Sequence, residues 1–215
     1  MSWMDSLGSA AKPGKNLSSE ERRRISGDLV NMSAMGAAAV TLAPIPVISD
    51  FALVTSVQGS MVAAVGRVYG RELTLAQAKD LLIELATVCG LGLIAQKGFA
   101  TITKILLPGL GGFLAAPYAY AVTYGMGHAS MTYFENKDYT KETIKRVYEE
   151  AVAEGRRIFS RETLNQFRKK KGAEVTDFAR EQAEQEAAPR RKPAPRKKAA
   201  KAGAKKRPAT RRPSR

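Results

Sequence analysis

The 215-residue chain has few of the side chains that enzymes and metal proteins use for chemistry, with one cysteine, Cys89, and one histidine, His128. A single cysteine excludes an internal disulfide and is typical of a reducing compartment. A zinc site or a Ser-His-Asp triad would depend on His128 alone. We therefore expect Cys89 to be a small buried residue and His128 to be packed or to lie at an interface, and we expect no metal, no cofactor and no enzymatic activity.

Nucleotide-binding and targeting motifs are missing from the sequence. It contains no G-x-x-x-x-G-K-[ST] phosphate loop, and the glycine-rich run 109–112 lacks the spacing of a dinucleotide-binding motif. We therefore expect no nucleotide hydrolysis. Asp5 interrupts the apolar residues near the start, so the N-terminus does not resemble a cleavable signal peptide and is expected to stay in the cytosol.

Strand-type alternation and Asn-Gly hairpin turns are also missing, which predicts an all-α fold. Residues 18–21 (Ser-Ser-Glu-Glu) and 74–77 (Thr-Leu-Ala-Gln) have the pattern of a capping box, and each predicts the start of a helix. Asp50 is suited to the start of another helix, and Gly70 is suited to its end.

Charge is scarce from Leu29 to Phe134, where nine of 106 residues are charged. The uncharged stretches 29–49 and 105–134 are each long enough to cross a bilayer, which needs about 20 apolar residues. Basic flanking segments favour an even number of crossings, as two hairpin-like insertions with tips near Pro44–Pro46 and near Pro117. Prolines, glycines and hydroxyl groups in both stretches favour burial in protein instead. The sequence leaves both architectures open: an apolar helical bundle or membrane-associated helical hairpins.

Composition divides the chain into four segments. Residues 1–17 are rich in glycine and small polar residues and are predicted to be disordered, although Trp3, Met4 and Leu7 could form a short apolar turn. Residues 18–135 form the apolar helical body. Residues 136–187 follow a 3.6-residue apolar period and predict an amphipathic helical segment, with a break at 168–172. Residues 188–215 form a basic tail that is predicted to be disordered because it has no large apolar side chain to bury.

The tail contains no acidic residue in positions 189–215, where 13 residues are Lys or Arg. The formal charge of the chain is +15, so residues 1–188 carry only +2. Such a tail binds nucleic acid by displacing counterions, binds anionic lipid headgroups, or only keeps the protein soluble. Its Lys/Ala/Pro composition resembles the tails of linker histones and of histone-like bacterial proteins. The candidate polyanion-binding residues are Arg190, Arg191, Lys192, Arg196, Lys197, Lys198, Lys201, Lys205, Lys206, Arg207, Arg211, Arg212 and Arg215.

Several short apolar motifs follow one another in the body. Residues 42–50 (Leu-Ala-Pro-Ile-Pro-Val-Ile-Ser-Asp) are followed by a turn at 67–70 (Arg-Val-Tyr-Gly). A Pro-Gly turn at 106–111 comes next, and then an Ala/Gly/Tyr-rich helix that ends at 132–135. In this order they resemble the bacterial family called domain of unknown function 697, over about Leu29 to Arg157. The motif residues are Pro44, Pro46, Asp50, Gln58, Tyr69, Gly70, Pro108, Gly109 and Gly111.

The resemblance implies a non-catalytic, membrane-associated helical adaptor that works with an Era-like GTPase, here in trans because the chain has no GTPase domain. It also implies a place at the bacterial inner membrane, and the basic charge of the chain after Lys137 predicts that this part, with the tail, lies on the cytoplasmic side. The alternative is a soluble DNA-associated protein of the cytoplasm or nucleoid, whose apolar body forms the core of a homo-oligomer.

Overall fold

The computed structural model describes residues 3–11, 17–43, 50–91, 111–136 and 138–187, and these ranges contain helices and no strand. The prediction of an all-α fold is confirmed. In chain order the helices are α1 (Trp3–Ala10), α2 (Ser19–Val40), α3 (Asp50–Val68), α4 (Leu75–Val88), α7 (Gly111–Glu135), α8 (Lys141–Ile158) and α9 (Arg161–Ala187).

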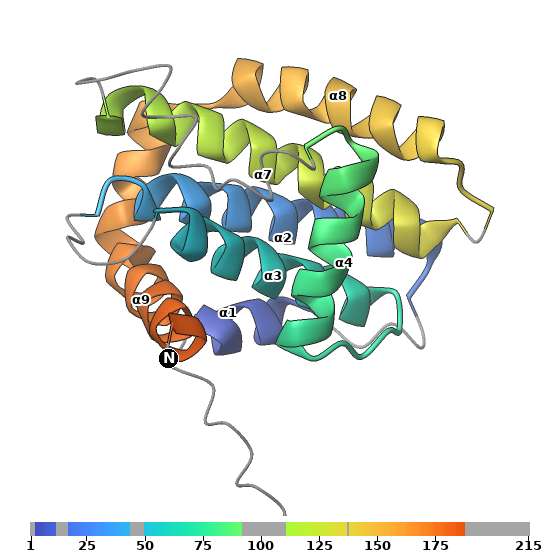
Figure 1. Cartoon of the computed structure of the whole chain (residues 1–215), viewed down its shortest axis with the longest axis horizontal. Helices are drawn as coiled ribbons and strands as arrows, with labels where there is room; N and C mark the ends of the chain where they lie inside the picture. Colours follow the sequence, from blue (N-terminus) through green and yellow to red (C-terminus); the bar gives the residue numbers. More distant parts are fainter. Residues whose placement is uncertain (1–2, 12–16, 44–49, 92–110, 137, 188–215) are drawn as a thin grey trace, which may run out of the picture.

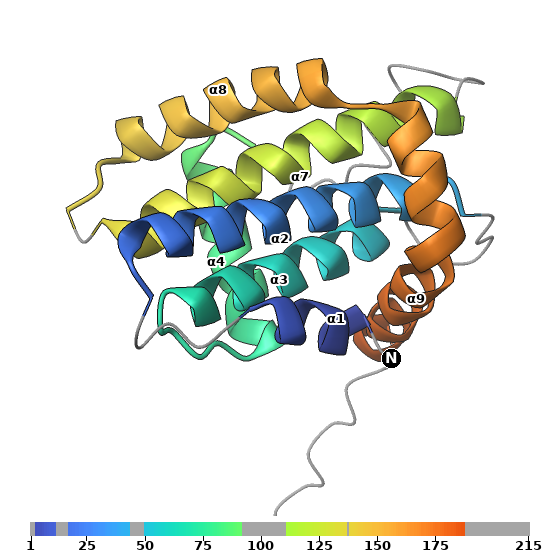
Figure 2. The same cartoon turned by 180° about the vertical axis from the view of Figure 1, so that it is seen from behind.

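Helix α2 lies at the centre of a stack in which α8, α7, α2 and α3 follow one another (Figures 1 and 2). It packs against α3 on one side and α7 on the other, and it also contacts α1 and α9. Helix α4 crosses the stack at one end, whereas α9 crosses it at the other. Helix α1 lies beside α3 and contacts α9, so the first and last helices meet.

The helix ends form where the sequence predicts them. Ser18 and Glu21 make both hydrogen bonds of a capping box, at 2.8 and 3.2 Å, and residues 74–77 do the same at the start of α4. Thr140 caps α8 through the amide of Thr143. Gly70 follows the end of α3 with φ of +76°, a conformation that glycine adopts without a steric cost.

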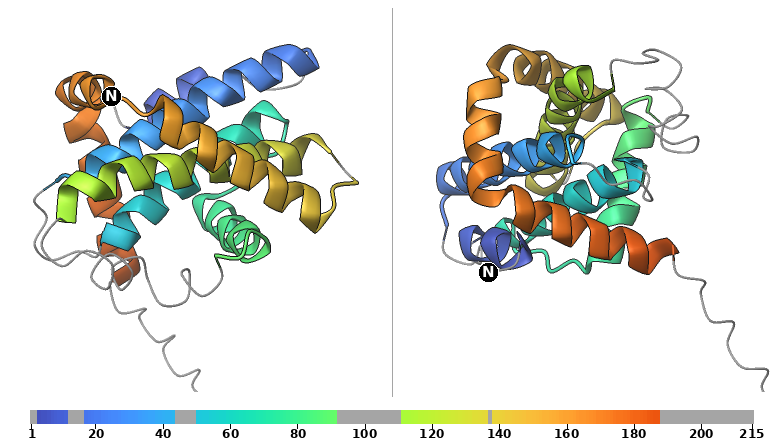
Figure 3. Two further views of the ribbon diagram at one scale, coloured as in Figure 1. Left: turned by 90° about the horizontal axis from the view of Figure 1, so that it is seen from above. Right: turned by 90° about the vertical axis from the view of Figure 1, so that its left-hand side faces the viewer.

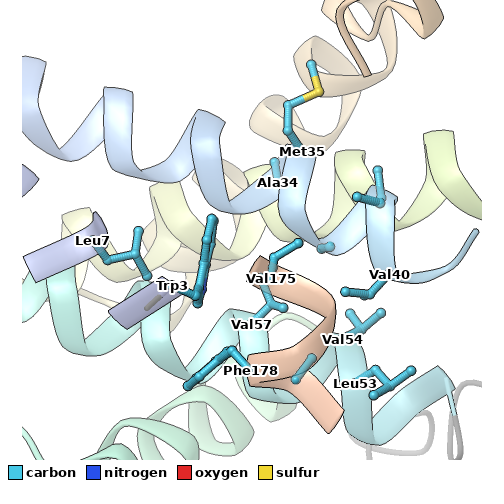
Figure 4. Close-up of a cluster of buried hydrophobic side chains, with 14 of the residues drawn as sticks. Trp3, Leu7, Ala34, Met35, Val40, Leu53, Val54, Val57, Val175 and Phe178 are labelled. Atoms are coloured by element: carbon cyan, nitrogen blue, oxygen red, sulfur yellow. The ribbon is translucent and has the colours of Figure 1, made fainter. Parts of the chain in front are cut away.

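Two hydrophobic clusters form the core. The first joins α1, α2, α3, α7 and α9 and includes Trp3, Leu7, Val57 and Phe178 (Figure 4). The second joins α3, α4, α7 and α8 and includes Val30 of α2. Every residue of α2 from Ser33 to Val40 is buried. Burial on several sides accounts for the lack of charge in this part of the chain, because an unpaired charge there would be desolvated.

Two glycines of α7 let its neighbours approach closely. A Cβ atom on Gly127 would lie 2.4 Å from both methyl groups of Val30 on α2. One on Gly125 would lie 2.5 Å from a methyl group of Val152 on α8. The small residues of α7 therefore allow the α2–α7 and α7–α8 contacts at the centre of the stack.

Among the described residues, no helix combines the length and the apolar character needed to cross a bilayer. The hairpin tip predicted near Pro117 is wrong, because α7 continues through this proline from Gly111 to Glu135. A proline inside a helix removes one hydrogen bond and crowds the preceding turn, and the burial of Ala116 and Tyr120 against the core outweighs this cost. The other predicted tip, Pro44–Pro46, lies outside the described residues.

Two further predictions are wrong. Within the segment 1–17, which was expected to be disordered, residues 3–10 form α1, and its Trp3 and Leu7 are 0% and 1% exposed. Nor does the helix break at 168–172, because α9 is continuous, although its axis bends (Figure 3). In both cases burial of apolar side chains outweighs the local preference of the sequence.

Candidate functional site

A cavity of about 580 Å³ opens between α4 and the end of α7, and we call it the α4–α7 cavity. The turn at Gly70 redirects the chain after α3 and brings the segment 71–73 to its edge. One face of α4 and the last turn of α7 form its walls, and Tyr139 closes it from the segment before α8. The lining residues are Arg71, Leu73, Gln77, Asp80, Leu81, Glu84, Tyr133, Phe134, Asn136 and Tyr139.

Aromatic rings make up one wall of this cavity. The ring centroids of Tyr133 and Tyr139 are 5.0 Å apart, and the ring of Phe134 meets that of Tyr133 edge-on at 5.3 Å. Behind the wall, Phe134 stacks on Tyr69 at 6.3 Å. These contacts connect the wall to α3 and therefore fix the rings relative to α4.

Two carboxylates stand on the opposite wall. Asp80 and Glu84 are four residues apart on α4, so they lie on one face of the helix, and both are exposed. The pKa of Tyr139 is raised, first by desolvation and then by the negative charges of nearby groups that include Glu84. Among the described residues that line the cavity, Arg71 is the one basic residue. These described residues therefore combine aromatic faces with a net negative charge.

A second cavity, of about 590 Å³, lies between α9 and the end of α2. Arg168 and Lys169 line it, and both are exposed, as is the adjacent Lys170. The next residue, Lys171, is engaged by Glu174 at 2.8 Å and by the Ser6 hydroxyl of α1 at 3.0 Å. The first three basic residues therefore form an exposed patch, which we call the α9 basic patch.

The structure describes the contacts of three predicted motif residues, Gln58, Tyr69 and Gly70, and these contacts stabilise the fold. Gln58 donates a hydrogen bond from Nε2 to Thr123 Oγ1 at 2.9 Å and joins α3 to α7 within the core. Tyr69 supports the aromatic wall, and Gly70 forms the turn that leads to the α4–α7 cavity.

The other predicted residues lie at the edge of the described ranges or beyond them. Asp50 is the first residue of α3, as its suitability for a helix start predicted, and Gly111 is the first residue of α7. Pro44, Pro46, Pro108 and Gly109 lie outside the described residues. So do all 13 candidate polyanion-binding residues of the tail, which belong to positions 188–215.

Cys89 is buried, as predicted, and His128 is half-buried and packs against Tyr124. Cys89 is 6% exposed, and burial raises the pKa of its thiol to about 12, which disfavours the reactive thiolate. The ring of His128 lies 4.6 Å from that of Tyr124, and desolvation lowers the pKa of the imidazole. In the described ranges no group of three His, Cys, Asp or Glu residues is arranged to hold a metal ion.

Sequence reasoning did not find the α4–α7 cavity. Its residues come from four segments, and together they span from Arg71 to Tyr139. The spacing of Asp80 and Glu84 was the one available signal, because it places two carboxylates on a helix face without a basic partner four residues away.

The described residues thus define an all-α domain built around two central helices rich in small residues. Comparison with family models identifies the family: residues 10–157 match the one described as Domain of unknown function (DUF697). The chain therefore belongs to this family, and the match begins earlier than the resemblance from Leu29 predicted. Helix α9 and the tail follow the matched region. No match was found among curated proteins or among solved structures.

Proposed function

We propose that this protein is a non-catalytic helical adaptor whose tail binds polyanions, and duplex DNA in particular, without sequence preference. The observation that carries the proposal is the charge of residues 189–215, with 13 basic residues and no acidic one. Each contact between a basic residue and a phosphate releases condensed counterions, which supplies affinity that does not depend on the base sequence. The tail contains no aromatic residue, so base stacking contributes nothing.

The α9 basic patch supports this proposal from the described part of the chain. Arg168, Lys169 and Lys170 are exposed on the helix that leads into the tail. Exposed Asp177, Glu181 and Glu184 lie on α9 between this patch and the tail, so a duplex held by the tail contacts the patch only by bridging this acidic stretch. We expect the patch to add a small share of the affinity, because three residues release fewer counterions than 13.

The body is proposed to act as a scaffold. The described parts of the two apolar stretches lie in α2 and α7, and the buried residues of these helices explain the lack of charge there by contact with protein. The inner-membrane location and the GTPase partner stay predictions that rest on the family resemblance. Anionic lipid is the competing ligand of the tail, since each basic residue near such a surface contributes about 1 kcal/mol.

A titration of the full chain against duplex DNA and against anionic vesicles, at several salt concentrations, tests the proposal. If roughly 6–10 basic residues meet phosphates, affinity for DNA should fall by about 10³–10⁵ between about 50 and 200 mM salt. A full-length variant with all 13 basic residues of the tail replaced by glutamine should lose nearly all DNA binding. A variant with only Arg168, Lys169 and Lys170 replaced should keep most of it.

Two results would contradict the proposal. An affinity that does not depend on salt, or equal binding by the glutamine-tail variant, would show that the tail does not bind DNA in this way. Strong binding to anionic vesicles together with weak DNA binding at the same ionic strength would identify a lipid surface as the ligand.

A further inference from the structure

We propose that the α4–α7 cavity binds lysine and arginine side chains of the chain's own tail, residues 189–215. This proposal rests on the proposed function in one respect. If the tail binds polyanions, the body and the polyanion compete for the same basic residues. The basic side chains of the tail would fill the cavity, and their positive charge would explain its aromatic and acidic walls.

The chemistry of the walls suits a cationic side chain. Ammonium and guanidinium groups bind the faces of tyrosine and phenylalanine rings within about 6 Å of the centroid, and they pair with carboxylates. Asp80 and Glu84 supply two carboxylates, and neither forms an ion pair with any other described residue. Opposite them stand Tyr133 and Tyr139. Arg71 opposes a cation, but the charged residues in the described part of the lining still sum to one negative charge.

An ion pair places the end of α9 against α4, the helix that forms one wall of this cavity. Glu186, near the end of α9, pairs with Lys79 of α4, and the ammonium group of Lys79 also donates to Ser56 of α3 at 3.3 Å. Lys79 directly precedes Asp80, and it lies five residues before Glu84, about 8 Å along the helix axis. The tail therefore begins beside α4, and it has to pass around this helix to reach the carboxylates, because Asp80 and Glu84 lie about 100° and 140° around the helix axis from Lys79.

The length of the tail is sufficient. Arg190 is four residues beyond Glu186 and can lie up to about 14 Å from it, while Lys198 can lie up to about 43 Å away. Basic residues from 190 to 198 can therefore reach Asp80 and Glu84. The tail also leaves α9 next to the exposed Glu181 and Glu184, which favours its staying near the protein surface.

Tethering makes weak contacts sufficient. A single exposed ion pair contributes little on its own. A segment joined to its site by a short flexible linker has an effective concentration in the millimolar range, so several such pairs together keep it bound. Duplex DNA carries a much denser row of charges and displaces the tail from the cavity. We therefore expect the body to weaken the DNA affinity of its own tail several-fold at low salt.

Zero-length carbodiimide cross-linking of the full chain tests this directly, because the reagent joins carboxylates to lysine amines that are in contact. We expect mass spectrometry to find Asp80 and Glu84 linked to Lys192, Lys197 or Lys198, and we expect added duplex DNA to abolish these links. The matched control is Glu142 and Glu150 on α8, which are also exposed. Links to Glu181 and Glu184 follow from chain adjacency, so if tail lysines are found only there, or equally at the control residues, the proposal is wrong.

An equal mixture of ¹⁵N-labelled and unlabelled chains identifies the source of the tail. Links within one isotopic chain support the proposal, whereas mixed links would show that the cavity binds the tail of a second copy and would overturn it. DNA titration gives the independent readout. The D80N/E84Q variant should bind DNA several-fold more tightly than the E142Q/E150Q variant, although both gain the same charge.

The two proposals fail separately. If no variant binds DNA but the links at Asp80 and Glu84 form, the DNA function is wrong and the docking of the tail stands. If DNA binding depends on the tail but the links are absent, only the docking is wrong. The cross-linking requires no substitution, so a variant that fails to fold does not prevent the test.

Discussion

The indole Nε1 of Trp3 donates a hydrogen bond to the hydroxyl of Ser60 at 3.1 Å, although 57 residues separate the two along the chain. Trp3 is fully buried, and Phe167 of α9 meets its ring edge-on at a centroid distance of 6.4 Å. A Cβ atom on Gly36 of α2 would lie 3.2 Å from the same indole. One side chain of α1 therefore contacts α2, α3 and α9 together.

Trp3→Ala should lower the free energy of unfolding by about 3–5 kcal/mol, the usual cost of removing a large buried aromatic side chain. Trp3→Phe should cost less, because it keeps most of the apolar contact and loses the hydrogen bond to Ser60. Urea denaturation followed by circular dichroism measures both. A change below about 1 kcal/mol for Trp3→Ala would mean that α1 does not stabilise the fold.

Gly127→Ala should destabilise the protein by about 1–3 kcal/mol, because the new methyl group would overlap Val30. Val30→Ala in the same chain should restore part of the loss by making room. The control is Gly27→Ala on α2, where no atom lies within 4 Å of the new Cβ, and which should stabilise the helix by about 0.5–1 kcal/mol. Equal effects at the two glycines would contradict the close packing of α2 on α7.

Cys89 should react very slowly with a thiol reagent in the native protein at pH 8. Its pKa of about 12 leaves about one thiolate in 10⁴ at that pH, and the side chain is buried. In denaturant the thiol should react at the rate of an ordinary cysteine. The measurement is the release of thionitrobenzoate with and without urea, and rapid native labelling would contradict the burial of Cys89.

The stability of the protein should decrease as the pH falls below about 6.5, owing to His128. Desolvation lowers the pKa of His128 in the folded state, although the negative charge of Glu154 opposes this shift. As the pH falls, the unfolded chain therefore takes up a proton before the folded chain does, and unfolding is favoured. Urea midpoints at pH 7.5 and pH 5.5 measure the effect, and His128→Phe should reduce the difference. An identical pH dependence in that variant would show that other groups cause it.

The helix starts at 19 and 75 could be predicted because capping is local: the hydrogen bonds of each box join residues three apart. Helix α1 could not be predicted in this way. Eight residues are too few for a stable isolated helix, and what fixes them is burial of Trp3 and Leu7 against distant helices. The same applies to α9, where buried Val175 and Phe178 follow the basic run that was expected to end the helix.

Of the two candidate sites, the sequence predicts one and does not predict the other. The charge of the tail is a property of composition and can be read from the sequence. The α4–α7 cavity depends on which faces of α4 and α7 meet, and no single segment contains the pattern. The order of short apolar motifs did identify the family, and the described motif residues Gln58, Tyr69 and Gly70 turned out to hold helices and turns in place.

The contact between the first and last helices has a consequence for synthesis of the protein on the ribosome. Ser6 of α1 donates to Glu174 of α9 across 168 residues, and the first hydrophobic cluster extends from Trp3 to Ala183. That cluster cannot be completed until α9 has emerged, whereas the second, built from residues between Val30 and Tyr148 with their neighbours, needs no contribution from α9. Contacts between such distant residues form late, because the intervening chain must first be brought together. During translation the apolar surfaces of α2 and α3 that α9 covers therefore stay exposed to solvent until α9 has been synthesised. In this interval the nascent chain is most prone to aggregate and to bind chaperones.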